Sequence, residues 1–218
     1  MTAGGDERGL LVGCPRCAEP VGLEAGGVRA DCSVHGPVPA LWRAAQPAYD
    51  AFGALLVAAD GFPTYLPWPL APGWRVSDFA YVAGPAGARA TMTCCSGSSE
   101  LDGPVDLVVV TEEPATGLGA RVAGVAGDPG PDLGRGRPAA HVRLDGQSVA
   151  LWPLSTSAAD ADFDRSVVVG EAHGRWLWLV LRPASAMLLL GDDQSFRDVA
   201  AAGPALVELE FGGPAPVW

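Results

Sequence analysis

Hydrophobic and polar positions along most of the chain follow the pattern typical of β-strands. Short apolar-rich runs are separated by turns rich in glycine, proline or aspartate. These runs predict strands at residues 74–82, 88–95, 105–111, 140–144, 148–152, 167–171, 176–181 and 187–190. The pattern therefore indicates a mainly β protein.

Helical spacing of apolar residues is clearest over residues 49–59, where Pro47 suits the first turn and Gly61 ends the pattern. A short helix at 195–202, followed by a strand at 205–211, is predicted to close the fold. The expected class is α+β and mainly β, with one or two helices beside a mostly antiparallel sheet.

The segment FPTYLPWPLAPGWRV, at residues 62–76, is rich in proline. It can form neither a regular helix nor a central strand, because proline lacks a backbone N–H and fixes its own φ. We expect an extended segment that is held against the body of the protein by Tyr65, Trp68 and Trp74.

Turn residues predict how some of the strands are joined. Asp145-Gly146 is a preferred two-residue hairpin turn, and residues 171–175 predict a second, looser hairpin connection. Residues 114–138 hold many glycines and prolines and are predicted to form a loop. A loop of this length is unusual in a compact domain. Such a loop carries function or simply moves.

The N-terminal segment contains two short pairs of metal-ligand residues, CPRC at 14–17 and CSVH at 32–35, with fourteen residues between them. Zinc prefers four tetrahedral sulfur or nitrogen ligands, and two such pairs supply them with little backbone strain. Residues 21–23 and 28–30 can form a small hairpin between the pairs, across Gly26-Gly27.

The predicted zinc ligands are Cys14, Cys17, Cys32 and His35. Four protein ligands leave no coordination position for water or substrate, so the predicted Zn²⁺ is structural. A redox-active Cys-x-x-Cys pair is the alternative. These patterns divide the chain into a zinc-ribbon-like module at 1–40, a connector and helix at 41–63, and a mainly antiparallel β domain at 64–218.

Composition narrows the range of functions. All 14 basic residues are arginines, so lysine nucleophiles, Schiff bases and P-loops are excluded. The net charge of −11 disfavours nucleic acid as a partner. The apolar runs are much shorter than the ~20 residues that span a bilayer, and the N-terminus lacks the features of a secretory signal. We therefore expect a cytoplasmic protein without membrane contact, in which the five cysteines favour metal binding over disulfides.

Nucleophilic or acid–base chemistry has only weak candidates. Residues 146–150 partly match a nucleophile elbow, but the elbow needs a strand-to-helix turn and a hairpin is predicted here. His141 can lie near Ser148 across that hairpin. Glu171 and His173 would share one strand face and support proton transfer, although a solvated hairpin end is favoured.

Acidic clusters offer oxygen ligands for a hard cation, but they lack the pattern of an EF-hand, so solvated loop charges are favoured. They are Glu112-Glu113, Asp160-Asp162-Asp164 and Asp192-Asp193.

Two further motifs have simple structural interpretations. Residues 117–122 begin like a dinucleotide fingerprint, but Val122 replaces the third glycine, and a mobile loop is preferred. Cys94 and Cys95 fall on opposite faces of a predicted strand, so one is expected in the core and the other exposed.

Several longer motifs carry a family resemblance: CPRC followed by CSVHG, YLPWPLAPGW, DLVVVTEEPATGLGARVAG, GEAHGRWLWLVLRP and LLLGDD. Over almost its entire length, the chain resembles an uncharacterised actinobacterial protein family with an N-terminal zinc-ribbon-like segment. Some members carry an automatically assigned phosphotransacetylase name, but these residues contain neither a coenzyme A site nor a phosphate cradle. The resemblance implies no catalytic residue.

We expect a non-enzymatic protein-binding or scaffolding protein whose zinc ribbon faces another protein or stabilises the larger domain. The alternative is a small-molecule enzyme or ligand sensor that uses a cleft in the β domain, near Glu112, Glu113, His141 or His173. At least two of these groups meeting beneath residues 117–124 would favour the alternative. A DNA-binding ribbon is disfavoured by the acidic charge.

Overall fold

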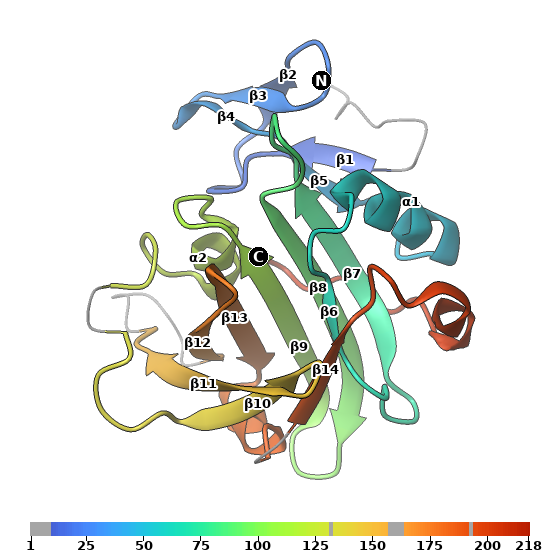
Figure 1. Cartoon of the computed structure of the whole chain (residues 1–218), viewed down its shortest axis with the longest axis vertical. Helices are drawn as coiled ribbons and strands as arrows, with labels where there is room; N and C mark the ends of the chain where they lie inside the picture. The colour runs from blue at the N-terminus through green and yellow to red at the C-terminus, as the bar shows by residue number, and fades with distance from the viewer. Residues whose placement is uncertain (1–9, 131–132, 157–163, 192–193) are drawn as a thin grey trace.

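The computed structural model describes residues 10–130, 133–156, 164–191 and 194–218. Within these residues, the protein has an 11-stranded, mostly antiparallel sheet, a separate 3-stranded sheet and few helices (Figure 1). The predicted class, mainly β with a small N-terminal ribbon, is confirmed.

The order of strands in the large sheet is β1 (Leu10–Gly13), β5 (Leu41–Ala44), β7 (Arg75–Val82), β8 (Ala90–Ser99), β9 (Gly103–Glu112), β13 (Arg175–Arg182), β12 (Ser166–Ala172), β11 (Gln147–Leu154), β10 (Ala140–Leu144), β14 (Gln194–Asp198) and β6 (Tyr65–Pro67). Neighbours are antiparallel except β10 and β14. The small sheet contains β2 (Val21–Leu23), β3 (Arg29–Cys32) and β4 (Gly36–Pro39). The helices are α1 (Tyr49–Ala59), α2 (Leu118–Ala123) and the 3₁₀ segments Ala184–Leu189 and Gly203–Glu208.

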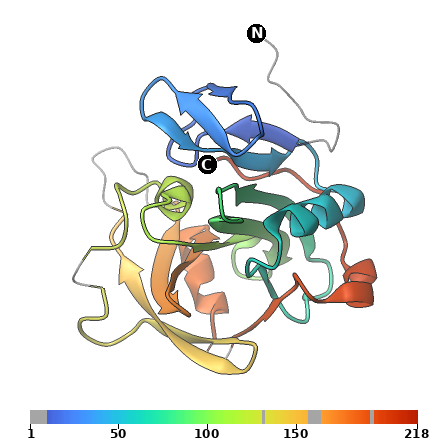
Figure 2. The same ribbon diagram turned by 45° about the horizontal axis from the view of Figure 1, so that its top comes forward.

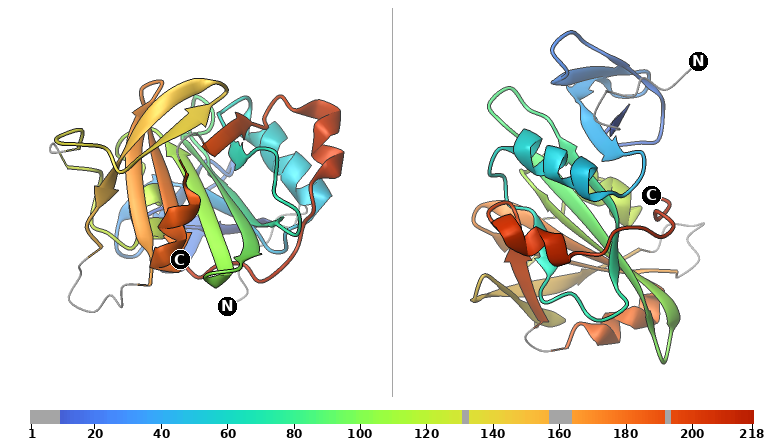
Figure 3. Two further views of the ribbon diagram at one scale, coloured as in Figure 1. Left: turned by 90° about the horizontal axis from the view of Figure 1, so that it is seen from below. Right: turned by 90° about the vertical axis from the view of Figure 1, so that its right-hand side faces the viewer.

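The large sheet curls so that its last strands lie over its centre (Figure 3). β6 contacts β8 and β9, although it stands at one end of the strand order. The Thr93 hydroxyl donates to the Tyr65 carbonyl at 2.7 Å, which ties the two layers together. Leu107, Leu179 and Phe196 pack in the space that the curl encloses.

Both faces of the central strands are covered (Figure 2). On one face α1 packs Phe52 edge-on against Phe79, with ring centroids 5.0 Å apart. On the other face α2 contacts β9 and β13. Cys94 and Cys95 point to opposite faces, and both are 0% exposed. The prediction that one of them is exposed is therefore wrong, because neither face of β8 is open to solvent at these positions.

Most of the local predictions are confirmed. α1 spans residues 49–59, and Asp145 and Gly146 have the positive φ values, 46° and 89°, of a two-residue hairpin turn. His173 and Gly174 form the second turn, with φ values of 53° and 76°. In the proline-rich segment, Tyr65 is buried and Trp68 and Trp74 pack against the core, while β6 pairs only with β14 among the described strands.

Three predictions near the C-terminus are wrong. Residues 187–190 lie in or beside the 3₁₀ segment Ala184–Leu189, and 205–208 lie in the segment Gly203–Glu208 instead of a strand. Residues 195–198, predicted as helical, belong to β14. β14 is stabilised by pairing with β10 and β6, which are distant in the sequence, so long-range pairing overrides the local pattern.

The N-terminal region is joined to the large sheet by two further strands. β5 lies within the predicted connector, and β1, which precedes the first ligand pair, pairs with it. The division of the chain at residues 40 and 63 remains a prediction. Among the described residues, no helix has the length and apolar character needed to cross a membrane.

The close contact between β11 and β12 requires a glycine in β12. A Cβ at Gly170 would lie 2.4 Å from the Ala150 carbonyl oxygen, which is backbone and cannot rotate away. We expect Gly170→Ala to lower the free energy of unfolding by about 1–3 kcal/mol through overpacking. Chemical denaturation of both proteins measures this.

Gly53→Ala is the matched control, because a Cβ at Gly53 in α1 meets nothing within 4 Å. Alanine there should stabilise the helix by about 0.5–1 kcal/mol. Equal effects of the two substitutions would contradict the close contact between β11 and β12.

Candidate metal centre

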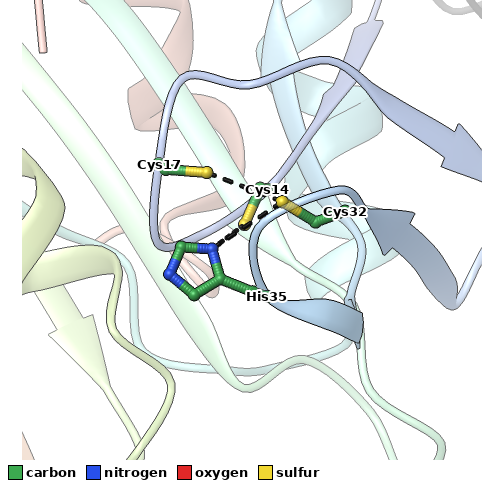
Figure 4. Close-up of side chains that lie close together, drawn as sticks. All are labelled: Cys14, Cys17, Cys32 and His35. Atoms are coloured by element: carbon green, nitrogen blue, oxygen red, sulfur yellow. Dashed lines mark hydrogen bonds between the residues drawn. The ribbon is translucent and has the colours of Figure 1, made fainter.

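The two ligand pairs lie in tight turns at the same end of the small sheet (Figure 4). Cys14 and Cys17 follow β1, whereas Cys32 ends β3 and His35 immediately precedes β4. Gly36 has a φ of 64°, a left-handed conformation that glycine adopts without steric cost and that turns the chain away after His35. The turn residues therefore direct all four side chains to one point.

The four ligand atoms lie close enough together to surround one metal ion. All four lie within 4.8 Å of one another. The Cys17 and Cys32 sulfurs are 3.6 Å apart, and His35 Nδ1 is 3.7 Å from the sulfurs of Cys14 and Cys32. Zinc–sulfur and zinc–nitrogen bonds of about 2.3 and 2.1 Å give tetrahedral ligand separations of about 3.6–3.8 Å. The cluster can hold a metal ion such as zinc.

The environment of the thiols affects how readily they ionise. All five cysteines, each in the described part of the chain, carry free thiols. Burial raises the pKa of Cys14 to about 11, although the Arg16 and Cys17 amides oppose this. Burial also opposes ionisation of Cys32, but the Val34 and His35 amides and the side chains of His35 and Cys17 lower its pKa to about 6. A bound cation would favour the thiolate form of both.

We call Cys14, Cys17, Cys32 and His35 the metal cluster. Two arginines connect it to the large sheet by hydrogen bonds, and we call them the arginine latch. Arg16, in the first turn, donates to the carbonyls of Ala115 and Thr116 at 2.8 and 3.4 Å. Arg121, on α2, donates in the other direction to the Cys14 carbonyl. Residues 118–123, which fall largely in the loop predicted at 117–122, form α2 and connect the cluster to the sheet.

α2 is held in place by a carboxylate from the sheet. Glu112, at the end of β9, accepts hydrogen bonds from the backbone N–H groups of Leu118 and Gly119 at 2.8 and 3.1 Å. A Cβ at Gly119 would lie 2.2 Å from the Trp178 indole nitrogen, so only glycine fits there. The glycines that resemble a nucleotide fingerprint thus serve packing, and Glu112 fills the position at which that motif holds a phosphate.

The prediction that Glu112 is a solvated loop charge is wrong, since its side chain is 0% exposed. Burial raises its pKa to about 7, although the two backbone N–H groups that donate to it lower the pKa. A signal for this burial exists in the sequence. Glu112 follows Val108 and Val110 at the period of two that defines one face of β9, and that face packs against α2.

The other acid–base candidates do not form a common site. Glu113 pairs with Arg89 at 3.1 Å near the surface, and His141 and His173 are exposed. Among these described residues, none of the three meets Glu112 beneath α2. The Glu171 carboxylate accepts the Gly174 N–H at 2.8 Å and belongs to the hairpin turn, as expected for a solvated end.

The remaining candidates for catalysis or cation binding either have no catalytic partner nearby or lie outside the described residues. His141 pairs in register with Ala150, while Ser148 lies opposite Arg143, and the hairpin turn here leaves no elbow. Asp164 pairs with Arg165 at 2.7 Å. Asp160, Asp162, Asp192 and Asp193 lie outside the described residues.

A cleft lies between the metal cluster and α2. It has a volume of about 580 Å³, and its walls include His35 and Arg16 on one side and Arg121 and Asp128 on the other. Neither Glu112, Glu113, His141 nor His173 lines this cleft, all four being within the described residues.

Comparison with known proteins identifies a family but no activity. A model of a family of unknown function, DUF6758, matches residues 11–218, almost the entire chain. No curated protein and no solved structure matches the chain. The family match therefore assigns no reaction, and the function has to be inferred from the geometry.

The buried Glu112 carboxyl should make stability depend on pH. Its pKa is about 7 in the folded protein against an ordinary value of 4.5, so between these values the folded state binds more protons than the unfolded state. The contribution of Glu112 to the free energy of unfolding should fall as pH rises through this window, by up to about 1.4 kcal/mol per pH unit.

Glu112→Gln removes the titration and should flatten that slope, as measured by urea denaturation from pH 4.5 to 7.5. Glu113→Gln, a change at the neighbouring surface carboxylate, is the control and should retain the slope. Identical pH dependence of stability in the wild-type protein and in Glu112→Gln would contradict the burial of Glu112.

Proposed function

The chain belongs to DUF6758, a family of unknown function, and we propose that it is a non-enzymatic protein-binding or scaffolding protein with a structural zinc ribbon. The observation that carries this proposal is the convergence of Cys14, Cys17, Cys32 and His35, whose ligand atoms all lie within 4.8 Å of one another. The acid–base candidates, by contrast, are dispersed over the large sheet.

A structural role for zinc follows from the ligand count and from the small size of the module. Four protein ligands complete a tetrahedral shell, so no position is left for water or substrate. The three short strands β2, β3 and β4 bury little apolar surface of their own; Ala30 and Val38 join the core beneath them. Metal binding would supply the folding energy that such a small sheet lacks.

A protein partner is supported by the surface of the ribbon. Val34 is 65% exposed at the tip of the second metal turn, and Leu23 on β2 is 44% exposed. The metal would hold this turn rigid, which lowers the entropic cost of binding. The acidic net charge of −11 favours a protein over a nucleic acid as the partner.

A ligand sensor is the alternative function, and the cleft between the metal cluster and α2 favours it. Arg16, Arg121 and Asp128 give this cleft charged groups of both signs. None of the acid–base candidates Glu112, Glu113, His141 and His173, all in the described part of the chain, lines it. A small molecule there would act by binding.

Metal analysis tests the zinc assignment. Purified protein should contain about one zinc ion per chain by mass spectrometry, and Cys32→Ser should lose most of it because a three-ligand site binds weakly. Chelation should lower the melting temperature. Cys94→Ala removes a buried cysteine outside the cluster and should retain the metal. Protein expressed with ample zinc that contains neither zinc nor a substitute metal would contradict the assignment.

Affinity recovery from native lysate tests the partner surface. Val34→Asp leaves all four ligands in place but adds a charge to the exposed tip, so it should reduce recovery of a specific partner at least about tenfold, with the zinc content unchanged. Val207→Asp makes the same change at a 71% exposed site outside the ribbon and should have no effect. Equal recovery by the two variants would count against the ribbon as the contact.

A further inference from the structure

The C-terminal segment lies across the large sheet and ends near the N-terminal segment and α2 (Figure 2). It is joined to β7 through Val76, whose N–H donates to the Glu210 carbonyl at 2.8 Å and whose carbonyl accepts the Gly212 N–H at 3.0 Å. Residues 213–218 belong to no helix or strand of the described structure. They are held by a separate set of contacts at the far end.

The Trp218 indole occupies a site built from charged side chains. Its N–H donates to the Asp78 carboxylate at 2.9 Å. The guanidinium groups of Arg43 and Arg121 lie 4.2 and 4.6 Å from a ring centroid of the indole, within the range of cation–π attraction. Asp78 is 1% exposed and also accepts from Arg43 at 2.7 Å. The indole thus meets a buried acceptor and two cations.

The backbone of the segment is recognised by arginines from two distant strands. Arg43 on β5 donates to the Pro216 carbonyl at 2.8 Å, and Arg182 on β13 donates to the Val217 carbonyl. Pro216 is buried, whereas the Val217 side chain is 86% exposed and 213–215 are exposed. Recognition by successive carbonyls and one inserted side chain is the way in which grooves bind extended peptides.

Stability alone does not account for these charges. A buried ion pair costs desolvation energy, and apolar residues of the same volume stabilise a core at least as well. A segment held mainly by Pro216, Trp218 and two carbonyl contacts is also the kind of element that opens locally without global unfolding. The site therefore has the properties of a binding groove with a detachable occupant.

We propose that Arg43, Asp78, Arg121 and Arg182 form a peptide-binding site for an extended segment that presents a tryptophan side chain. Residues 214–218 occupy this site in the free protein, and a tryptophan-bearing segment of a partner protein displaces them. The proposal goes beyond the zinc-ribbon contact, because it concerns the face of the large sheet and holds whether or not Val34 binds a partner.

The geometry also specifies the ligand. A phenylalanine side chain would fill the same space but would leave the buried Asp78 carboxylate without the indole donor. Loss of a hydrogen bond to a buried charged group costs at least about tenfold in affinity. Tryptophan should therefore be strongly preferred to phenylalanine at this position.

Binding of a synthetic peptide in trans tests the site. The peptide PAPVW, which has the sequence of residues 214–218, is labelled at its N-terminus and titrated into a chain that lacks those residues, with fluorescence polarisation as the readout. We expect saturable binding, at least about tenfold weaker for PAPVF. The wild-type chain should bind PAPVW at least about tenfold more weakly, because its tethered segment competes at a millimolar effective concentration.

A second variant covers the case in which the shortened chain does not fold. Full-length Trp218→Ala keeps the backbone contacts and removes only the indole. N-acetyl-tryptophanamide should bind it by calorimetry and raise its melting temperature, while N-acetyl-phenylalaninamide should bind at least about tenfold more weakly. Val207→Ala, which retains Trp218, is the control and should not respond to either probe.

Two results would overturn the proposal. One is a folded, shortened chain that binds PAPVW no better than PAPVF. The other is a folded Trp218→Ala protein that gives no saturable response to N-acetyl-tryptophanamide at millimolar concentration. In the shortened chain, Asp78→Asn should reduce the preference for PAPVW over PAPVF, which separates recognition of the indole N–H from general apolar binding.

Discussion

The Arg121 guanidinium connects the three parts of the molecule that carry its candidate functions. It extends from α2, donates to the Cys14 carbonyl in the metal cluster and lies over the Trp218 ring of the C-terminal segment. Burial lowers its pKa, the cost expected when a cation leaves water. That cost is offset only where partners surround the group, so the position of α2 has to be fixed accurately. Glu112 provides this by accepting the first amides of the helix.

Cover on both faces of the large sheet creates the conditions for this arrangement, with the curled-over strands on one face and α2 on the other. Because both faces of the central strands are covered, side chains that would be half-exposed in an open sheet are buried, among them Cys94, Cys95 and Glu112. The face toward α2 is apolar over much of its area, where Met92, Val110 and Val180 pack, and it becomes charged where the C-terminal segment crosses it. The apolar part of this face packs against α2, and the charged part contacts the C-terminal segment.

The metal cluster and the indole site are physically linked, although each can be tested alone. The backbone of the first metal turn accepts Arg121, and the same guanidinium contacts the indole. A change that loosened the turn around Cys14 would alter one of the two cations at the indole site. Through Arg121 on α2, a change in the conformation of the first metal turn can therefore alter the indole site on the large sheet.

The sequence alone determined the features that depend on neighbouring residues: the ligand pairs 14–17 and 32–35, the Asp145-Gly146 turn and the helix at 49–59. Turn chemistry and short spacing act within a few residues, so no distant contact is needed to recognise them. Only the tertiary structure decided that 194–198 form a strand and that Trp218 meets Asp78, 140 residues away. Such features depend on which distant strands pair and which faces become covered, and these follow from the packing of the whole chain.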